Sequence, residues 1–435
     1  RGLRRGGRGT ADLRCGGDQV GHHRLRLLDV GAQRHAGGVE ARQSLLELGG
    51  ALGTRGELGP RGLEAALADE LGRLGAASVA PVDGGAGFAG TLELAYAVNL
   101  ESRIASRVLW KVGGGIYRDE RELNALAHSI PWPKHFRVDR TIRVDVAATR
   151  SPLRSLEFAT LSIKDAVCDR FRDEGGRRPS VDKRAADVRV HAYLTERDAT
   201  FYLDTSGEPL FKRGWRRDAE DAPLRENLAA GLIALSGWQP GTAFLDPMCG
   251  SGTIAIEAAS IAADRAPGLT RTFGFQKLAW FDGPTWQRLR QRARDRLKPS
   301  PSQPAVFASD RLSAAVATTR TNAALAQVDG HLAIEQADAL TRPAPAPEGI
   351  LIANPPYGIR LEDKARVAAM YPKLGDALKA RYAGWSAFLF SGDTELPKKI
   401  GLKAERRTPL WNGAIECRLY AYRIVAGRLD PGRSL

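Results

Sequence analysis

Five short apolar runs in the second half of the chain constrain its fold more than any other feature. Helical patterns such as TIAIEAASIAADRA and LSAAVATTRTNAALAQ lie between them, and the runs themselves are TAFLDP, AVFASD, LAIEQAD, GILIAN and SAFLFSG. Short apolar runs bounded by turns predict buried strands, and strands that alternate with helices predict a mostly parallel, doubly wound α/β sheet. Ligands of such a sheet bind beyond the carboxyl ends of its strands. Four of the runs end at candidate pocket residues, which are Asp246, Asp310, Asp338 and Asn354.

The end of this region has a different pattern. In WNGAIECRLYAYRI the dipeptide Asn412-Gly413 signals a two-residue hairpin, and apolar residues then alternate with Glu416, Arg418 and Tyr420. Alternation with a period of two is typical of a strand. We therefore expect an antiparallel strand to complete a Rossmann-like domain over residues 214–428.

Residues 60–213 predict a separate α+β domain. RGLEAALADELGRLGA places leucines on one helical stripe that Gly75 can close, and TLELAYAVNLESRIASRVLWKV is typical of a helix that leads into a strand. RTIRVDVAATRS and ADVRVHAYLTERDATFYLDTSG alternate as strands do, the latter as two strands around a turn. Between them, LEFATLSIKDAVCDRFRDEG predicts a helix that ends at Gly175 and Gly176.

Residues 1–59 show little sustained periodicity, are rich in Arg and Gly, and contain no Lys. One interpretation is a disordered RNA-binding arm. The other is a wrongly chosen start in a GC-rich coding region, because the chain begins with Arg1 and its first methionine is Met248. We favour the second interpretation and expect this segment to be disordered or not native. No apolar region follows the arginines, so the segment does not resemble a secretory signal.

Composition favours a soluble protein with a polyanionic partner. The chain has 435 residues and a net charge of +14, and no apolar stretch approaches the roughly 18–20 residues of a membrane span. Its four cysteines lie far apart and its seven histidines form no paired helix motif, which suits a reducing cytoplasm and predicts no metal. The segment LFKRGWRRDAED combines basic residues with a tryptophan and is either a solvated linker or an RNA-binding segment. The candidate phosphate ligands are Lys212, Arg213, Arg216 and Arg217.

The stretch DPMCGSGTIAIEAA predicts a strand, a tight glycine turn and a helix. Gly250 and Gly252 let the backbone approach a ligand closely, and the helix start offers free N–H groups to an anion. The turn also fits a dinucleotide fingerprint, but the second strand ends at Asp310, far beyond the roughly 20 residues which that pattern requires. We therefore favour S-adenosylmethionine (SAM) as the ligand. The expected cofactor-binding residues of this motif are Asp246, Pro247, Cys249, Gly250, Ser251, Gly252 and Thr253.

Each acid at a strand end has a plausible role in that pocket. Asp310 can accept hydrogen bonds from the ribose hydroxyls, Asp338 from the adenine amino group, and Asp246 can meet the methionine ammonium. A single Asp at a strand end is more often a helix N-cap. Three of them around one glycine loop favour the pocket.

Asn354-Pro355-Pro356-Tyr357 follows the fourth apolar run and faces the same crevice. An exocyclic amine on a nucleobase must be oriented before it can attack a methyl group. The Asn354 and Pro355 carbonyls can accept its hydrogens, the two prolines hold these acceptors rigidly, and Tyr357 can stack on the base. This is catalysis by positioning and electrostatics, and it requires a base exposed from its helix.

Together these residues resemble a known family. DPMCGSGTIAIEAA with NPPYG resembles the class I SAM-dependent amino methyltransferases, and RPSVD, LDTSGEPLFKRGWR, APLRENLAA and LWNGAIECRLYAY resemble the bacterial 23S rRNA guanine-N2 methyltransferases. The resemblance implies a ferredoxin-like piece and a THUMP RNA-binding domain ahead of the catalytic domain. It covers about Pro60 to Ala426. Ile359 stands where family members often carry an acid, and one methyltransferase domain predicts one modification.

The resemblance implies methyl transfer from SAM to the N2 amine of a guanine in 23S rRNA. The alternatives are a tRNA guanine-N2 methyltransferase, a DNA adenine methyltransferase, and an RNA-binding ribosome assembly factor without activity. The basic α+β domain argues for RNA over DNA. Intact Gly250, Gly252, Asp310 and Asn354 argue against the inactive factor.

Overall fold

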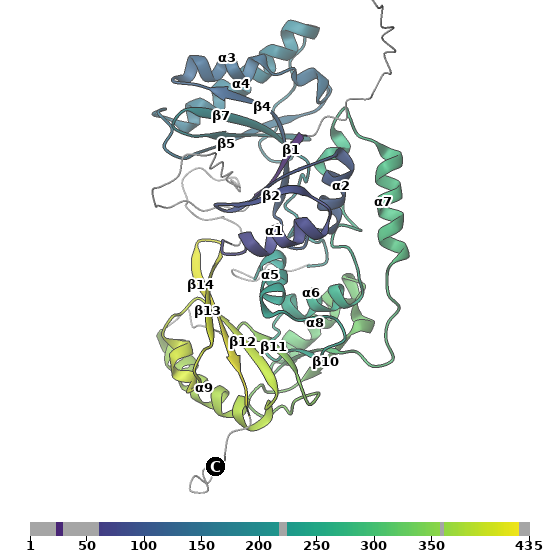
Figure 1. Cartoon of the computed structure of the whole chain (residues 1–435), viewed down its shortest axis with the longest axis vertical. Helices are drawn as coiled ribbons and strands as arrows, with labels where there is room; N and C mark the ends of the chain where they lie inside the picture. The colour runs from purple at the N-terminus through teal and green to yellow at the C-terminus, as the bar shows by residue number, and fades with distance from the viewer. Residues whose placement is uncertain (1–22, 29–60, 217–223, 357–360, 426–435) are drawn as a thin grey trace, which may run out of the picture.

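Two seven-stranded sheets, one in each half of the chain, make up the architecture of the computed structural model (Figure 1). The structure describes residues 23–28, 61–216, 224–356 and 361–425. No helix in these ranges is both long and apolar enough to cross a membrane.

The N-terminal half begins with a leucine-striped helix packed on a small antiparallel sheet. Leu67 and Leu71 of the stripe are buried, and Gly75, with φ of 88°, follows the end of this helix as predicted. The elements of this first part are α1 (Glu64–Arg73), β2 (Ala77–Val82), β3 (Gly85–Gly90), α2 (Leu92–Glu101) and β4 (Arg107–Ile116).

The second part of the N-terminal half extends the same sheet through β4, giving the order β2-β3-β1-β4-β7-β6-β5, in which β1 is His23–Leu28. Two helices cover one face of the extension (Figure 1). The longer one ends in a left-handed glycine, Gly176, as expected. The elements are α3 (Glu120–Ser129), a 3-10 turn η1 (Trp132–Lys134), β5 (Ile142–Ala148), α4 (Leu156–Gly175), β6 (Val188–Leu194) and β7 (Asp198–Asp204).

One strand of this sheet corrects the expectation for residues 1–59. β1 (His23–Leu28) lies between β3 and β4 and pairs with both in antiparallel fashion. HRLRLL alternates Arg with Leu over only a few residues, and the sheet supplies partners on both sides of so short a strand. We expected residues 1–59 to be disordered or not native, and residues 23–28 form a strand of this sheet instead. The rest of residues 1–60 lies outside the described residues.

The C-terminal half is a seven-stranded sheet in the order β10-β9-β8-β11-β12-β14-β13. The five predicted parallel strands form where the apolar runs lie, and β14 pairs antiparallel with β12 and β13. The β13–β14 hairpin is as predicted, but its register pairs Asn412 with Ile415, so the turn residues are Gly413 and Ala414. The strands are β8 (Phe244–Asp246), β9 (Val306–Asp310), β10 (Leu332–Gln336), β11 (Gly349–Ala353), β12 (Trp385–Ser391), β13 (Arg406–Asn412) and β14 (Ile415–Arg423).

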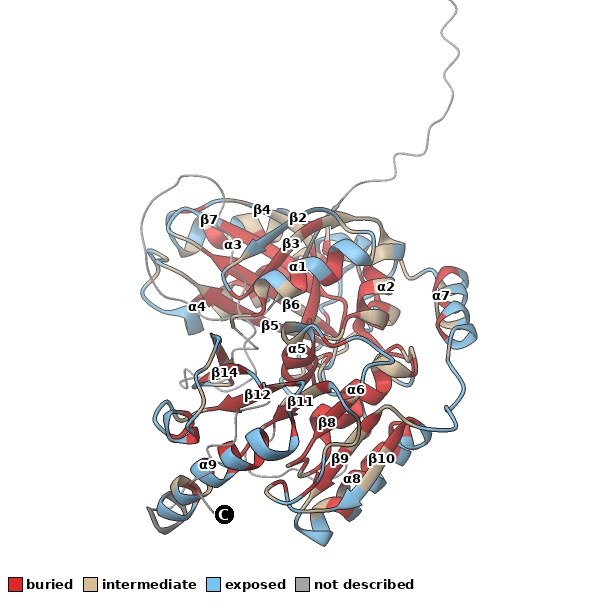
Figure 2. Cartoon of the chain, turned by 60° about the horizontal axis from the view of Figure 1, so that its bottom comes forward, coloured by how far each residue is buried: buried red, intermediate tan, exposed pale blue. Residues whose placement is uncertain are grey.

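Helices and 3-10 turns surround this second sheet. The helices are α5 (Glu226–Ser236), α6 (Thr253–Ala262), α7 (Gly283–Asp295), α8 (Ser313–Leu325) and α9 (Leu361–Arg381), and the 3-10 turns are η2 (Gly274–Lys277), η3 (Asp329–His331) and η4 (Leu396–Ile400). Figure 2 shows α6 buried along its length and α7 mainly exposed at the flank.

The insertion between α6 and β9 joins the two halves. Phe275 of η2 donates its N–H to the Thr205 carbonyl at 2.9 Å, and its ring lies 4.2 Å from that of Tyr96 in α2. Ala279 donates its N–H to the His135 carbonyl at 2.8 Å. One hydrophobic cluster consequently runs through both halves.

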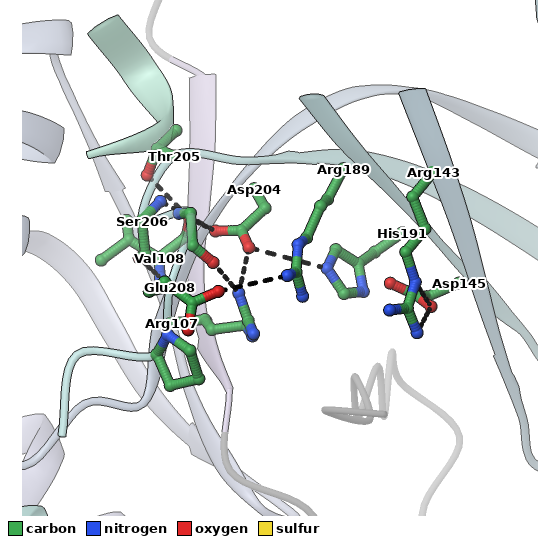
Figure 3. Close-up of polar contacts among 12 residues, drawn as sticks. Arg107, Val108, Arg143, Asp145, Arg189, His191, Asp204, Thr205, Ser206 and Glu208 are labelled. Atoms are coloured by element: carbon green, nitrogen blue, oxygen red, sulfur yellow. Dashed lines mark hydrogen bonds and ion pairs between the residues drawn. The ribbon is translucent and has the colours of Figure 1, made fainter. Parts of the chain in front are cut away.

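The turn that receives Phe275 is fixed by a buried carboxylate (Figure 3). Asp204 accepts hydrogen bonds from the backbone N–H groups of Ser206 and Gly207 and forms an ion pair with Arg107. Burial by itself would raise the pKa of Asp204, but Arg107 and His191 outweigh it and hold that pKa well below its ordinary value. The carboxylate therefore stays ionised and keeps β7 and β4 in place at the joint.

Candidate active site

The predicted pocket residues lie along one edge of the second sheet. Asp246 and Asp310 are the last residues of β8 and β9, which are parallel neighbours. Asn354 follows the last residue of β11, the neighbour of β8 on its other side. Asp338 lies two residues beyond β10, at the exposed end of the row. Strand order thus brings together side chains that are far apart in sequence.

The glycine loop between β8 and α6 is held against β9. Cys249 donates its N–H to the Ser309 carbonyl at 3.0 Å, and Gly250 donates its N–H to Asp310 Oδ2 at 3.1 Å. Gly250 and Gly252 have φ values of 53° and 87°, in the left-handed region that favours glycine. Gly252 is the N-cap of α6. The loop therefore has the tight turn that its sequence predicts.

Two residues of α8 support this loop, and no sequence signal identified them. Thr319 donates from Oγ1 to the Gly250 carbonyl at 2.8 Å, and Asn322 donates from Nδ2 to the Ser251 carbonyl at 3.0 Å. Both are buried. They lie within an alanine- and threonine-rich helix whose sequence gives no indication of which face meets the loop.

The carboxylates of the pocket differ in environment. Asp246 is buried, and this burial, with Asp310 nearby, raises its pKa to about 8. Asp310 is half-buried and accepts backbone hydrogen bonds from Gly250 at Oδ2 and from Leu312 at Oδ1, the latter at 3.0 Å. Asp338 is exposed and accepts from the Leu340 N–H at 2.8 Å.

Pro247 and Cys249 complete the loop's buried side. Burial raises the pKa of the Cys249 thiol, and its Sγ lies 3.5 Å from Thr319 Oγ1. The thiol is therefore neutral and acts as a packing group.

The start of the tetrapeptide presents an unsatisfied acceptor. The Oδ1 atom of Asn354 is buried and has no hydrogen-bond partner among the residues that the structure describes. Pro355 is buried and Pro356 is exposed. Tyr357 lies outside the described residues, so its predicted stacking role stays a prediction.

The basic linker does not present its side chains as predicted. Arg213 is buried, with its Nε atom 3.2 Å from Glu257 Oε1 and its other nitrogens donating to carbonyl oxygens. The predicted contact of Arg213 with RNA phosphate would therefore require this side chain to leave Glu257. Arg216 is mostly buried and bonds to α6, whereas Lys212 is exposed and paired with Glu208. Arg217 lies outside the described residues.

Comparisons with protein families match three successive parts of the chain. Residues 59–109 match the RlmL ferredoxin-like domain, residues 117–204 the THUMP domain, and residues 213–421 the RMKL-like methyltransferase domain. Solved structures of similar fold include a putative methyltransferase complexed with SAH, at 28% identity and a TM-score of 0.77, with 94% of this chain and 99% of that chain covered. A possible methylase from Clostridium difficile 630 has 27% identity and a TM-score of 0.79, covering 94% and 100%.

Curated relatives agree with these matches. A protein of Syntrophotalea carbinolica named ribosomal RNA large subunit methyltransferase K/L is 41% identical over 379 residues, which are 85% of this chain and 53% of that protein. The protein of the same name from Psychromonas ingrahamii is 42% identical, covering 85% and 50%. The chain spans about half the length of the curated relatives it matches. The chain therefore contains a ferredoxin-like domain and a THUMP domain, followed by a class I methyltransferase domain that matches the RMKL-like model.

Proposed function

We propose that the chain transfers a methyl group from SAM to the exocyclic N2 amine of a guanine in 23S rRNA. The observation that carries this proposal is the buried Oδ1 atom of Asn354, which has no hydrogen-bond partner among the described residues and lies at the edge where the glycine loop lies. A buried acceptor without a donor is costly, and such groups point to a ligand that supplies the donor. An exocyclic amine carries N–H donors that can pair with this oxygen.

The residues of the loop fit a SAM molecule. Apart from its chain neighbours, no described residue has an atom within 4 Å of where a Cβ of Gly250 would stand, so space for a ligand remains beside the backbone. Asp310 uses one lone pair of each oxygen for backbone N–H groups and keeps others for ribose hydroxyls. Asp246 lies beside the loop and can meet the ammonium group. Bound there, SAM supplies an electrophilic methyl group on its sulfonium.

Asn354 and Pro355 orient the attacking amine. The Asn354 side-chain carbonyl and the Pro355 backbone carbonyl each accept one N–H, which draws electron density onto the nitrogen and aims it at the methyl group. The N–CH₃ bond forms as the S–CH₃ bond breaks, and the extra proton on nitrogen then leaves to water. No strong general base is required, because the methylated nitrogen is positively charged and loses its extra proton readily.

The domain architecture and the names of the relatives support RNA as the substrate. We place the activity in the cytoplasm, where the rRNA is found. The three cysteines in the described ranges, Cys168, Cys249 and Cys417, are free and buried, as in a reducing compartment.

The test is incubation of the purified chain with tritiated SAM and, separately, with large-subunit rRNA and tRNA. We expect label in the rRNA, released as N2-methylguanosine on digestion to nucleosides. Label only in tRNA, or label in an adenine, would overturn the proposal that the substrate is a guanine in 23S rRNA. SAM binding without transfer to either RNA would favour an inactive assembly factor.

A further inference from the structure

Helix α6, which follows the glycine loop, is contacted on one face by arginines that lie outside the sheet. Thr253 and Glu257 lie one turn apart in α6 and are both buried, with exposed fractions of 5% and 2%. Arg216 donates from Nη2 to Thr253 Oγ1 at 2.7 Å, and Arg213 Nε lies 3.2 Å from Glu257 Oε1. Two linker residues therefore hold two successive positions on one face of α6.

The far end of α6 is fixed in the same way to the N-terminal half. Arg103, between α2 and β4, donates from Nη2 to the Ser260 and Arg265 carbonyls at 3.2 and 2.7 Å. It also accepts a hydrogen bond at its own carbonyl from Arg213. A cation at the C-terminal end of a helix suits the helix dipole. Arg103 therefore stabilises α6 as well as locating it.

Arg216 has the opposite relation to the helix dipole. A cation near a helix N-terminus is electrostatically unfavourable, so helix stability does not explain its place beside Thr253. Glu226, buried at the start of α5, compensates the charge, with Oε1 3.3 Å from Arg216 Nε. Arg216 also donates to the Leu224 carbonyl at 3.1 Å. The guanidinium thus ties the first residue of α6 to the start of α5.

We propose that Arg216 is a positioning residue for cofactor binding. Acting through Thr253, it fixes the first turn of α6 and with it the loop from Cys249 to Gly252. This role replaces the predicted contact of Arg216 with RNA phosphate. It rests on the proposed function, because it takes that loop to be the SAM site.

The test uses the full chain with the variants Arg216→Lys, Thr253→Val and their combination. Lys keeps a charge beside Glu226 but lacks the guanidinium that reaches Thr253 and Leu224 together, and Val replaces the Thr253 hydroxyl by a methyl group of similar size. Isothermal titration with S-adenosylhomocysteine should show each single variant weakened about fivefold to tenfold. The double variant should be no weaker than the worse single variant, because both changes break one contact.

The control is Arg265→Lys, at the other end of α6, where Arg265 Nη2 donates to Gln327 Oε1 at 2.6 Å. We expect its cofactor Kd to stay within about twofold of the wild-type value, since its side chain does not reach the loop. RNA affinity of Arg216→Lys should equal that of the wild type. If Arg216→Lys does not fold, as thermal unfolding would show, Glu226→Gln replaces it, because this change weakens the hold on Arg216 without altering the loop or Thr253.

Three results would overturn the inference. Fully additive losses would mean that the two side chains act separately. An unchanged cofactor Kd with weaker RNA binding would restore the phosphate-contact role. A wild-type chain that does not bind S-adenosylhomocysteine would overturn the proposed function itself, and this is distinguishable because it is seen before any variant is compared.

Discussion

The amide oxygen of Asn354 is buried without a donor among the described residues, an arrangement that ordinarily costs about 1–3 kcal/mol. A donor on a bound substrate would pair with this oxygen and remove that cost, so the oxygen favours binding of a substrate that carries a donor. In the function that we propose, Asn354 contacts the amine of the substrate, whereas the glycine loop and Asp310 contact the cofactor. The two tasks can therefore be separated by substitution.

For Asn354→Ala we expect methyl transfer to fall by at least about a hundredfold, because the substitution removes one of the two acceptors that orient the amine. The S-adenosylhomocysteine Kd should stay within about twofold. Single-turnover kinetics and isothermal titration measure the two quantities. A parallel loss of cofactor affinity and activity would show that Asn354 belongs to the cofactor pocket instead.

Asp246 predicts a pH dependence of cofactor affinity. Its pKa is raised from 3.8 to about 8 by burial, so the carboxyl is mainly neutral at pH 6 and becomes a carboxylate as the pH rises through 8. A carboxylate attracts the ammonium of the cofactor more strongly. The S-adenosylhomocysteine Kd should therefore decrease from pH 6 to pH 8.5, and Asp246→Asn should flatten this dependence. A Kd that rises with pH in the wild type would contradict the role of Asp246.

The same shift sets a sign for stability. Between about pH 4 and pH 8 the folded protein holds a proton on Asp246 that the unfolded chain has lost. Asp246 therefore contributes stability that is fully present below about pH 4 and is lost as the pH rises towards 8. Cofactor binding and fold stability thus respond to Asp246 in opposite directions.

At the level of elements, the strands of the second sheet could be predicted well because the signals for them are local in sequence. Each apolar run marks a strand, the polar residues Asp246, Asp310 and Asn354 mark where strands end, and the glycines mark the loop. The support from Thr319 and Asn322 could not be predicted in this way. It depends on how α8 is rotated against the loop, and an alanine-rich helix has no strong amphipathic pattern to fix that rotation.

The two loop glycines make a matched pair for a test. A Cβ at Gly252 would stand 2.7 Å from Thr319 Cγ2, at a φ of 87°, whereas at Gly250 it would meet nothing within 4 Å. Gly250→Ala should therefore cost only the left-handed backbone penalty of about 1–2 kcal/mol. Gly252→Ala adds a clash with a side chain that is stiff in a helix and should cost about 2–4 kcal/mol. Urea unfolding measures both, and equal costs would show that Thr319 moves aside.

At the level of the whole molecule, the two halves share a hydrophobic cluster and a ring of aromatic side chains around Phe275. The sequence indicated an insertion between α6 and β9 but could not show that it packs on Tyr96 and Thr205. The sequence also could not show which basic residues of the linker are buried and which are exposed. Lys212, Arg213 and Arg216 look alike in sequence, and only the fold shows that Glu257 and Thr253 draw two of them inward.

This separation of roles yields a last prediction, for Lys212→Ala and Arg213→Ala. Lys212 is exposed and pairs with Glu208 on the surface, a contact of about 0–1 kcal/mol, so its loss should leave folding intact. If Lys212 meets a phosphate, the slope of log RNA affinity against log salt should flatten by about one. Arg213→Ala leaves Glu257 buried opposite Arg103 alone and should cost about 3–5 kcal/mol of stability in urea unfolding. Measuring RNA affinity across a salt series shows whether Lys212 contacts a phosphate. Equal slopes for wild type and Lys212→Ala would show that Lys212 does not contact a phosphate.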